Sequence, residues 1–338
     1  MENKVKNKLL NDNEMKVLEE MIEYPPKRLY KYVNADTCCK ILENNSIRMT
    51  APCDFNDPYD SKPIFRCSDN SIKYDRKAIL EMFKKERKFG MLDKNKQRGF
   101  LLFLKQYPYA TCEISYKEEI ERTRDSVCKD FRVLCLTENK DNILMWSHYA
   151  QNHSGAVIEF DTEHNLFNSC RRVIYSNEAP YINGSFTLKD EPSDLNISDM
   201  KEILSILYTK SDVWKYENEW RLYFNFMTNL GLPSMLKDYV NAEALENFKR
   251  EISNSEKSIH LPLFNEHITA VYLGCNIDIG KERMIVQLCK KNYPKAKIYK
   301  SVLDEKCFKI NFVDYEEFYK DDRDDIQKLA DIIATMYF

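Results

Sequence analysis

Glycine is scarce in this chain, and its spacing argues against the common nucleotide-binding loops. Only 7 of the 338 residues are glycine. No two of them are spaced as in a dinucleotide-binding fingerprint or a phosphate-binding P-loop. No Gly-x-Ser-x-Gly sequence is present either. The sequence therefore disfavours a standard Rossmann or Walker nucleotide site and an ordinary α/β-hydrolase.

The chain also lacks paired cysteine motifs, long apolar runs and a large net charge. Its 11 cysteines include no Cys-x-x-Cys motif, which argues against a zinc ribbon or a dithiol redox motif. No window is apolar enough for a membrane helix, and the N-terminus lacks the apolar region of a signal peptide. A net charge of −3 is not that of a generally basic, phosphate-binding protein. We therefore expect a cytoplasmic protein with reduced thiols and no membrane partner.

Strand and helix patterns alternate irregularly, which predicts an α+β fold with one mixed, mostly antiparallel sheet and several helices. Residues 1–27 are expected to form an N-terminal helix that ends at Pro25-Pro26. A single domain is predicted over 28–312, with a charged helical insertion at 72–130, followed by a C-terminal helix over 313–338. Runs rich in β formers predict strands at 28–33, 47–50, 131–137, 156–160, 171–175, 268–273, 296–299 and 308–312.

The most informative stretch covers residues 210–226. Read as a strand, it places Glu217, Glu219 and Arg221 on one face, because side chains alternate with a period of two. Two neighbouring carboxylates raise the pKa of one of them unless a cation neutralises the pair. Such a pair can stabilise an oxocarbenium-like transition state at a sugar carbon, or bind a divalent ion. The alternative interpretation is a structural ion pair.

A second candidate segment, residues 144–155, contains Trp146, Ser147, His148 and Tyr149. Its pattern predicts a helix that packs Trp146 and Tyr149 into the core, and the alternative places these side chains at a substrate. His148 can act as an acid, a base or a phosphate contact, because histidine titrates near neutral pH. Ser147 and His148 point about a quarter-turn apart on a helix, so they form no obvious nucleophile–base pair.

The third segment is the turn at residues 55–60, Phe-Asn-Asp-Pro-Tyr-Asp. Asn, Asp and Pro in succession fix a turn, since Asn and Asp side chains bond to their own backbone. In the functional interpretation, Asn56, Asp57 and Asp60 project into a cleft beside residues 210–226. There the aspartates could bind a metal or contact ribose hydroxyls. In the structural interpretation the segment is a plain turn.

Several short motifs follow one another along the chain. In order they are Leu29-Tyr30-Lys31-Tyr32, Phe55-Asn56-Asp57-Pro58-Tyr59-Asp60, Met145-Trp146-Ser147-His148-Tyr149 with His153-Ser154-Gly155, Glu159-Phe160-Asp161, and Trp214-Lys215-Tyr216-Glu217-Asn218-Glu219-Trp220-Arg221. Together they resemble the bacterial domain of unknown function 2971 (DUF2971) family over roughly residues 28–312. That resemblance implies no established activity.

The order of elements is also similar to that of ADP-ribosyltransferases, which have a first strand, a short helix, a strand, an aromatic-rich helix and a late glutamate strand. This resemblance implies NAD as co-substrate. Glu219 or Glu217 would hold a ribose hydroxyl and stabilise the oxocarbenium ion as nicotinamide leaves, and Tyr149 or Ser147 would be the middle residue. ADP-ribosyltransferases use an arginine or a histidine on the first strand. This chain departs from that pattern, because it offers Lys31 or Tyr32 there, with Arg28 just before them, and no histidine.

The leading hypothesis is an ADP-ribosyltransferase-like enzyme that acts on NAD and a protein or nucleic-acid acceptor, in phage defence or as a toxin. Glu219 would be catalytic, with Glu217 in support, and Glu219→Gln would abolish NAD consumption with little change in thermal stability. His148 would complete the catalytic set. No residue is assigned to a metal under this hypothesis, and the expected substrate contacts are Tyr30, Tyr32, Asn56, Asp57, Asp60, Trp146, Ser147, Tyr149 and Arg221.

Two other classes of function are open at this point. One is a metal-dependent phosphodiesterase or nuclease, acting on a nucleic-acid-linked substrate through Asp57, Asp60, His148, Glu217 and Glu219. The other is a non-enzymatic sensor or interaction module, in which the segment 72–130 binds a protein partner.

Overall fold

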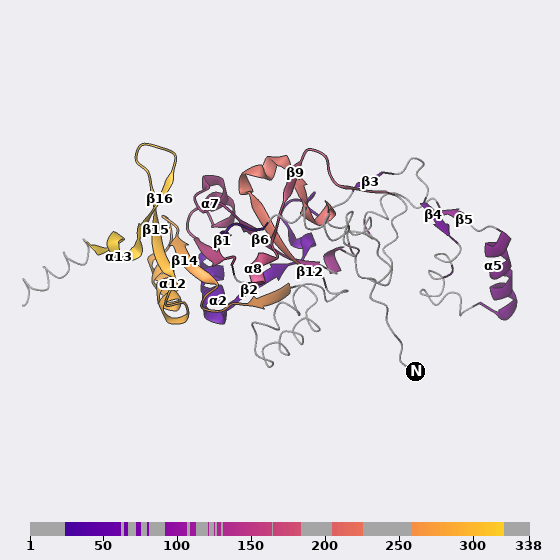
Figure 1. Cartoon of the computed structure of the whole chain (residues 1–338), viewed down its shortest axis with the longest axis horizontal. Coiled ribbons are helices and arrows are strands. Elements are labelled where there is room, and N and C mark those ends of the chain that lie inside the picture. Colours follow the sequence, from indigo (N-terminus) through magenta and orange to yellow (C-terminus); the bar gives the residue numbers. More distant parts are fainter. Residues whose placement is uncertain are drawn as a thin grey trace, which may run out of the picture. The chain divides into compact units, whose positions relative to one another are not determined.

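Figure 1 shows the computed structural model of the chain. The structure describes residues 24–61, 64–66, 72–75, 80, 92–106, 109–112, 121, 125, 127–129, 131–163, 165–183, 205–225 and 258–320. The chain divides into two compact units, the first made of Met1–Asp54, Phe131–Tyr175 and Asp212–Phe338, the second of Phe55–Asp130 and Ser176–Ser211. Most of the helices predicted at 1–27 and 313–338 falls outside the described residues.

A mixed sheet of ten strands forms the centre of the first unit. Its strands are β1 (Arg28–Val33), β2 (Ser46–Thr50), β6 (Phe131–Thr137), β7 (Ala156–Asp161), β8 (Arg171–Arg172), β12 (Glu219–Asn225), β13 (Ser258–Pro262), β14 (Ile268–Leu273), β15 (Lys297–Leu303) and β16 (Ile310–Asp314). The order is β13-β2-β6-β1-β7-β14-β15-β16, and β12 pairs with β6 and β8. β14 and β15 run parallel and the other pairs are antiparallel. The predicted α+β class is confirmed.

Helices cover both faces of this sheet. The parallel pair β14–β15 needs a crossover, which α12 (Ile279–Asn292) supplies after its cap residue Asp278. α2 (Ala35–Asn44) begins at Asn34, whose side chain accepts a hydrogen bond from the Thr37 N–H at 2.7 Å. α2 and α12 lie side by side (Figure 1). The described part of the first unit also contains the shorter helices α7 (Ile143–Tyr149), α8 (Asn165–Asn168) and α13 (Tyr315–Phe318), and the 3-10 helices η1 (Pro52–Asp54) and η3 (Asp212–Glu217).

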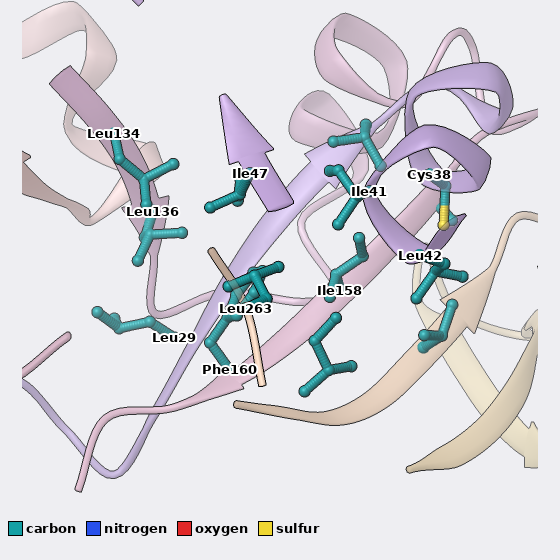
Figure 2. Packing of buried hydrophobic residues seen from close by; sticks show 14 of the residues in the cluster. Leu29, Cys38, Ile41, Leu42, Ile47, Leu134, Leu136, Ile158, Phe160 and Leu263 are labelled. Carbon is teal, nitrogen blue, oxygen red and sulfur yellow. The ribbon is translucent and has the colours of Figure 1, made fainter. Parts of the chain in front are cut away.

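Two hydrophobic clusters lie on opposite faces of the sheet, because successive strand residues point in opposite directions. Ile158 belongs to the larger cluster, together with side chains of α2 and α12. Figure 2 shows the packing of Leu29, Leu136, Ile158 and Phe160 with Ile41 and Leu42 of α2. The neighbouring Val157 belongs to the smaller cluster, whose members also include Tyr32, Trp146 and Tyr272. The candidate site lies on this second, aromatic face.

The second unit is described in part. β3 (Ile64–Arg66) and β10 (Tyr181–Asn183) pair in parallel, and β4 (Ile72–Asp75) pairs with β5 (Tyr109–Cys112) in antiparallel fashion. α5 (Lys94–Gln106) lies in the segment predicted as a helical insertion, and β4 and β5 are strands within that same segment. Two further strands in the described part of the chain are β11 (Thr209–Ser211), in the second unit, and β9 (Ile174–Ser176), where the chain leaves the first unit.

Candidate functional site

The stretch predicted as one strand is a helical turn, a backbone reversal and then a strand. Glu217 is the last residue of η3, and β12 begins at Glu219. Between them, Asn218 has a φ of 42°, a left-handed conformation that asparagine tolerates better than most residues. Its N–H donates to the Lys215 carbonyl at 3.2 Å. The prediction that Glu217 and Glu219 share a strand face is therefore wrong, because the backbone turns between them.

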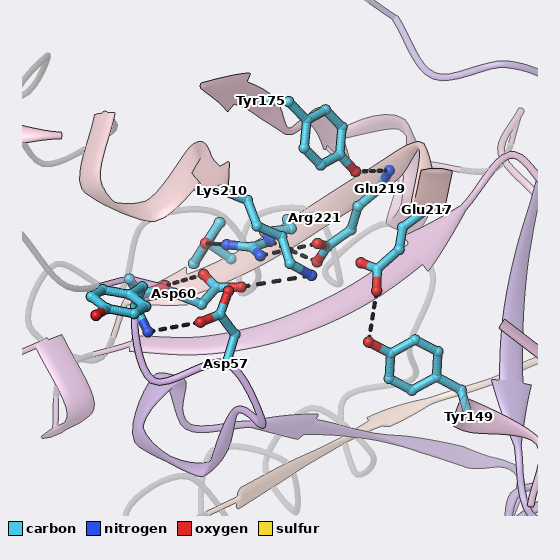
Figure 3. A network of polar contacts seen from close by, with 11 residues as sticks. Asp57, Asp60, Tyr149, Tyr175, Lys210, Glu217, Glu219 and Arg221 are labelled. Atoms are coloured by element: carbon cyan, nitrogen blue, oxygen red, sulfur yellow. Dashed lines mark hydrogen bonds and ion pairs between the residues drawn. The ribbon is translucent and has the colours of Figure 1, made fainter. Parts of the chain in front are cut away.

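Glu219 and Arg221 form a buried ion pair on β12 (Figure 3). Arg221 Nε lies 2.7 Å from Glu219 Oε1 and Nη2 lies 3.0 Å from Oε2, so the guanidinium binds both carboxylate oxygens. The two residues are 4% and 0% exposed, respectively. Arg221 Nη1 also donates to the Tyr223 hydroxyl at 3.2 Å, and the Glu219 N–H donates to the Tyr175 hydroxyl at 2.8 Å. For Glu219 and Arg221, the structure therefore fits the structural ion-pair interpretation.

Glu217 faces α7 rather than the strand. The Tyr149 hydroxyl donates to Glu217 Oε1 at 2.6 Å (Figure 3). Glu217 is 3% exposed, although it carries a carboxylate. The Thr137 hydroxyl donates to the backbone carbonyl of Glu217. The side-chain amides of Asn139 and Asn142 both donate to the backbone carbonyl of Tyr216, each at 3.1 Å. Side chains of residues 137–142 thus hold the end of η3, and they fix Glu217 against α7.

Removing the Tyr149 hydroxyl takes away a hydrogen-bond donor of the buried Glu217 carboxylate. We expect Tyr149→Phe to lower the free energy of unfolding by about 1 to 3 kcal/mol. Urea unfolding measures this change. Tyr24→Phe is the matched control, because Tyr24 is 70% exposed and its variant should unfold like the native protein. Equal stability of the two variants would show that the Tyr149–Glu217 bond contributes nothing.

α7 forms where the sequence predicts a helix, and its tryptophan packs inward. Asn142 caps it by accepting a hydrogen bond from the Met145 N–H at 3.2 Å. Trp146 is 0% exposed, and its indole N–H donates to the Lys140 carbonyl at 2.8 Å. The burial of Trp146 therefore fits the packing interpretation. His148 is exposed, and its ring lies 6.2 Å from the ring of Tyr149.

Tyr30 and Tyr32 share a face of β1, but they differ in exposure. Tyr32 is 7% exposed, and its hydroxyl accepts a hydrogen bond from the Asn142 N–H at 3.3 Å. Burial raises the pKa of Tyr32. Tyr30 is partly exposed and lies opposite Glu159 of β7. Burial, and then the Glu159 carboxylate, raise the pKa of Tyr30 to about 12, so both tyrosines stay neutral at physiological pH.

The aspartates of residues 55–60 belong to the second unit and are used within it. Asp57 accepts a hydrogen bond from the Tyr59 N–H at 2.8 Å, as expected for a self-capped turn. Asp60 lies 3.9 Å from the Lys210 ammonium, and both side chains are buried. Asn56 is exposed. A cleft that these residues share with Glu219 and His148 stays a prediction.

Sequence reasoning missed one contact on α7. Ser147 Oγ lies 3.1 Å from the Nε2 atom of His153. The pairing depends on the backbone path of residues 151–153, which no periodicity reveals. Within the described part of the chain, no three His, Cys, Asp or Glu side chains are grouped so as to hold a metal ion. The metal-dependent alternative therefore gains no support.

One family model, described as "Protein of unknown function (DUF2971)", matches residues 145–222 of the chain. The resemblance to DUF2971 is confirmed. The matched segment contains both Tyr149 and Glu217, as well as the Glu219–Arg221 pair. The match to DUF2971 does not extend to the motifs at residues 29–32 and 55–60. No curated protein and no solved structure matches the chain. In the ranges that the structure covers, no helix has the length and apolarity to cross a membrane.

Proposed function

We propose that this protein is an ADP-ribosyltransferase-like enzyme, which cleaves the bond between nicotinamide and ribose in NAD and transfers ADP-ribose to an acceptor. The observation that carries the proposal is the 2.6 Å hydrogen bond from Tyr149 to the buried Glu217. It joins the aromatic helix to the late glutamate segment, the two elements that the resemblance to ADP-ribosyltransferases assigns to the reaction. Both residues lie in the DUF2971 segment.

Glu217 suits the catalytic carboxylate better than Glu219 does. Positive charge develops on the ribose as neutral nicotinamide leaves, and a nearby carboxylate stabilises that charge. The charge of Glu219 is already compensated by the guanidinium of Arg221, which binds both of its oxygens. Glu217 Oε1 accepts the hydrogen bond of the Tyr149 hydroxyl, and burial strengthens the field of the carboxylate. Tyr149 is then the positioning residue for Glu217.

In the proposed reaction one bond to the ribose carbon breaks and another forms. The C–N bond between ribose and nicotinamide breaks, and its electron pair leaves with nicotinamide. An oxygen or nitrogen of the acceptor forms the new bond to the ribose carbon. In the proposal His148, exposed beside Tyr149, takes the proton of the acceptor, and the partly exposed Tyr30 contacts the ring of the co-substrate. The predicted role in phage defence or as a toxin depends on this reaction.

The proposal is tested with the purified full chain and NAD, with water as the simplest acceptor. We expect nicotinamide and free ADP-ribose to appear in equal amounts, measured by chromatography. Adding protein or nucleic acid should divert ADP-ribose into a covalent product, detected with labelled NAD. The proposal is overturned if the protein releases no nicotinamide under either condition and shows no binding of NAD in calorimetry.

A further inference from the structure

A serine and a histidine meet at the carboxyl end of α7, and neither of them takes part in the Tyr149–Glu217 hydrogen bond. Ser147 Oγ lies 3.1 Å from His153 Nε2 and 3.0 Å from the carbonyl oxygen of Ile143. Both side chains are partly buried. A hydroxyl has a single proton, so the two contacts correspond to two arrangements. When the imidazole proton is on Nδ1, Ser147 can donate to Nε2, which is the arrangement of a serine next to its general base.

The backbone that carries His153 is unusual. Gln151, Asn152 and His153 have φ angles of 50°, 53° and 64°, so three successive residues that are not glycine are left-handed. Each such residue costs of order 1 kcal/mol or more, and conformations of this kind persist where the surrounding structure fixes them, often at functional sites. The imidazole next to Ser147 thus belongs to a residue, His153, at the end of a strained turn.

Contacts from two sides hold this turn in place. The His153 N–H donates to the Trp146 carbonyl at 3.2 Å, and the His153 carbonyl accepts from the Asn276 N–H at 3.0 Å. The end of β14 also packs closely, because a Cβ on Gly274 would lie 2.1 Å from the His153 carbonyl oxygen. The imidazole lies nearly parallel to the buried Trp146 ring, with an interplanar angle of 10°. The ring is therefore oriented before any ligand binds.

The protonation state of His153 suits a base. Burial lowers the pKa of His153 below its ordinary value of 6.5. The imidazole is therefore neutral at pH 7, and it can accept a proton.

We propose that Ser147 and His153 form a second reactive centre, which takes the acyl group of a carboxylic ester. Ser147 Oγ attacks the ester carbonyl, and its proton passes to His153 Nε2. The ester C–O bond then breaks, and the leaving alkoxide takes the proton from His153 and departs as the alcohol. Ser147 is left as an ester, which water hydrolyses by the reverse sequence. This centre uses neither Glu217 nor NAD.

The test uses the full chain and a tagged fluorophosphonate as the probe. Ser147 Oγ forms the bond to phosphorus, the P–F bond breaks, fluoride leaves, and the serine proton passes to His153 Nε2. We expect one adduct, on the peptide that contains Ser147, located by mass spectrometry. We expect Ser147→Ala to abolish labelling and His153→Gln to slow it about 100-fold or more, the usual contribution of a general base. Absence of an adduct on Ser147 in the folded native protein overturns the proposal, and that result requires no variant.

Two control variants show whether labelling depends on Ser147 and His153 alone. Ser154→Ala should be labelled at the native rate, because Ser154 is a neighbouring serine whose hydroxyl donates to the Gln151 carbonyl at 2.6 Å. Glu305→Gln should also be labelled at the native rate, because Glu305 is exposed on the hairpin between β15 and β16. Labelling is measured without NAD, so failure here is distinct from failure of the NAD reaction. A folded His153→Gln protein, checked by circular dichroism, that is labelled as fast as the native chain would show that His153 is not the base.

Discussion

Replacing Arg221 with leucine lowers the free energy of unfolding by about 3 to 5 kcal/mol, because it removes the guanidinium that binds both oxygens of the buried Glu219 carboxylate. Arg221 is 0% exposed and binds both oxygens of Glu219, at 2.7 and 3.0 Å. Water cannot replace these bonds at a residue that is 4% exposed. Denaturant unfolding of the variant and the native chain measures the difference.

An exposed arginine gives the matched control. The side chain of Arg48 is 54% exposed and lies 3.7 Å from Asp54, so Arg48→Leu should change the free energy of unfolding by less than about 1 kcal/mol. The double variant Arg221→Leu, Glu219→Leu should recover part of the loss, since it removes both buried charges. If Arg221→Leu is as stable as Arg48→Leu, the pair is not the buried structural element described above.

The buried Glu219–Arg221 pair also changes what we expect of Glu219→Gln. From the residue pattern alone, Glu219→Gln is expected to abolish NAD consumption and leave thermal stability nearly intact. The structure shows that this change also removes a carboxylate that is paired with a fully buried guanidinium. We therefore expect Glu219→Gln to be destabilised, so that a loss of activity in this variant would not identify a catalytic group.

Several strands could be predicted from the sequence because their pattern is local. β1, β6 and β14 have the predicted bounds, and each combines β formers with an apolar face. β13 had no such prediction: it pairs with β2 along Ser258–Pro262, and this pairing with a distant strand is not visible in the local pattern. The fold class was therefore within reach of sequence reasoning, and the full set of strands was not.

The site was less predictable, because tertiary hydrogen bonds decide it. The β formers from Leu222 onward favour a strand, and they do form one. The preceding residues become a 3-10 helix because the Thr137 hydroxyl and two asparagine side chains satisfy the carbonyls at its end. Thr137 is 80 residues away from Glu217 in sequence, and no motif links the two. The pairing of Tyr149 with Glu217 could be found only in three dimensions.

Glu217→Gln has the largest effect that we expect on activity. The substitution keeps the size of the side chain and an oxygen that can accept the Tyr149 hydrogen bond, so the fold should survive. It removes the negative charge that the proposed transition state requires. By comparison with the loss of a single charge-stabilising group in other enzymes, nicotinamide release should fall about 100- to 1,000-fold. Glu305→Gln provides the control, because Glu305 is exposed on the hairpin between β15 and β16.

The most direct measurement is therefore the rate of nicotinamide release from NAD by Glu217→Gln. It is made under conditions in which circular dichroism shows the native and variant chains to be equally folded. Our account predicts a loss of about 100-fold or more, with Glu305→Gln at the native rate. A folded Glu217→Gln protein that releases nicotinamide as fast as the native chain would contradict it.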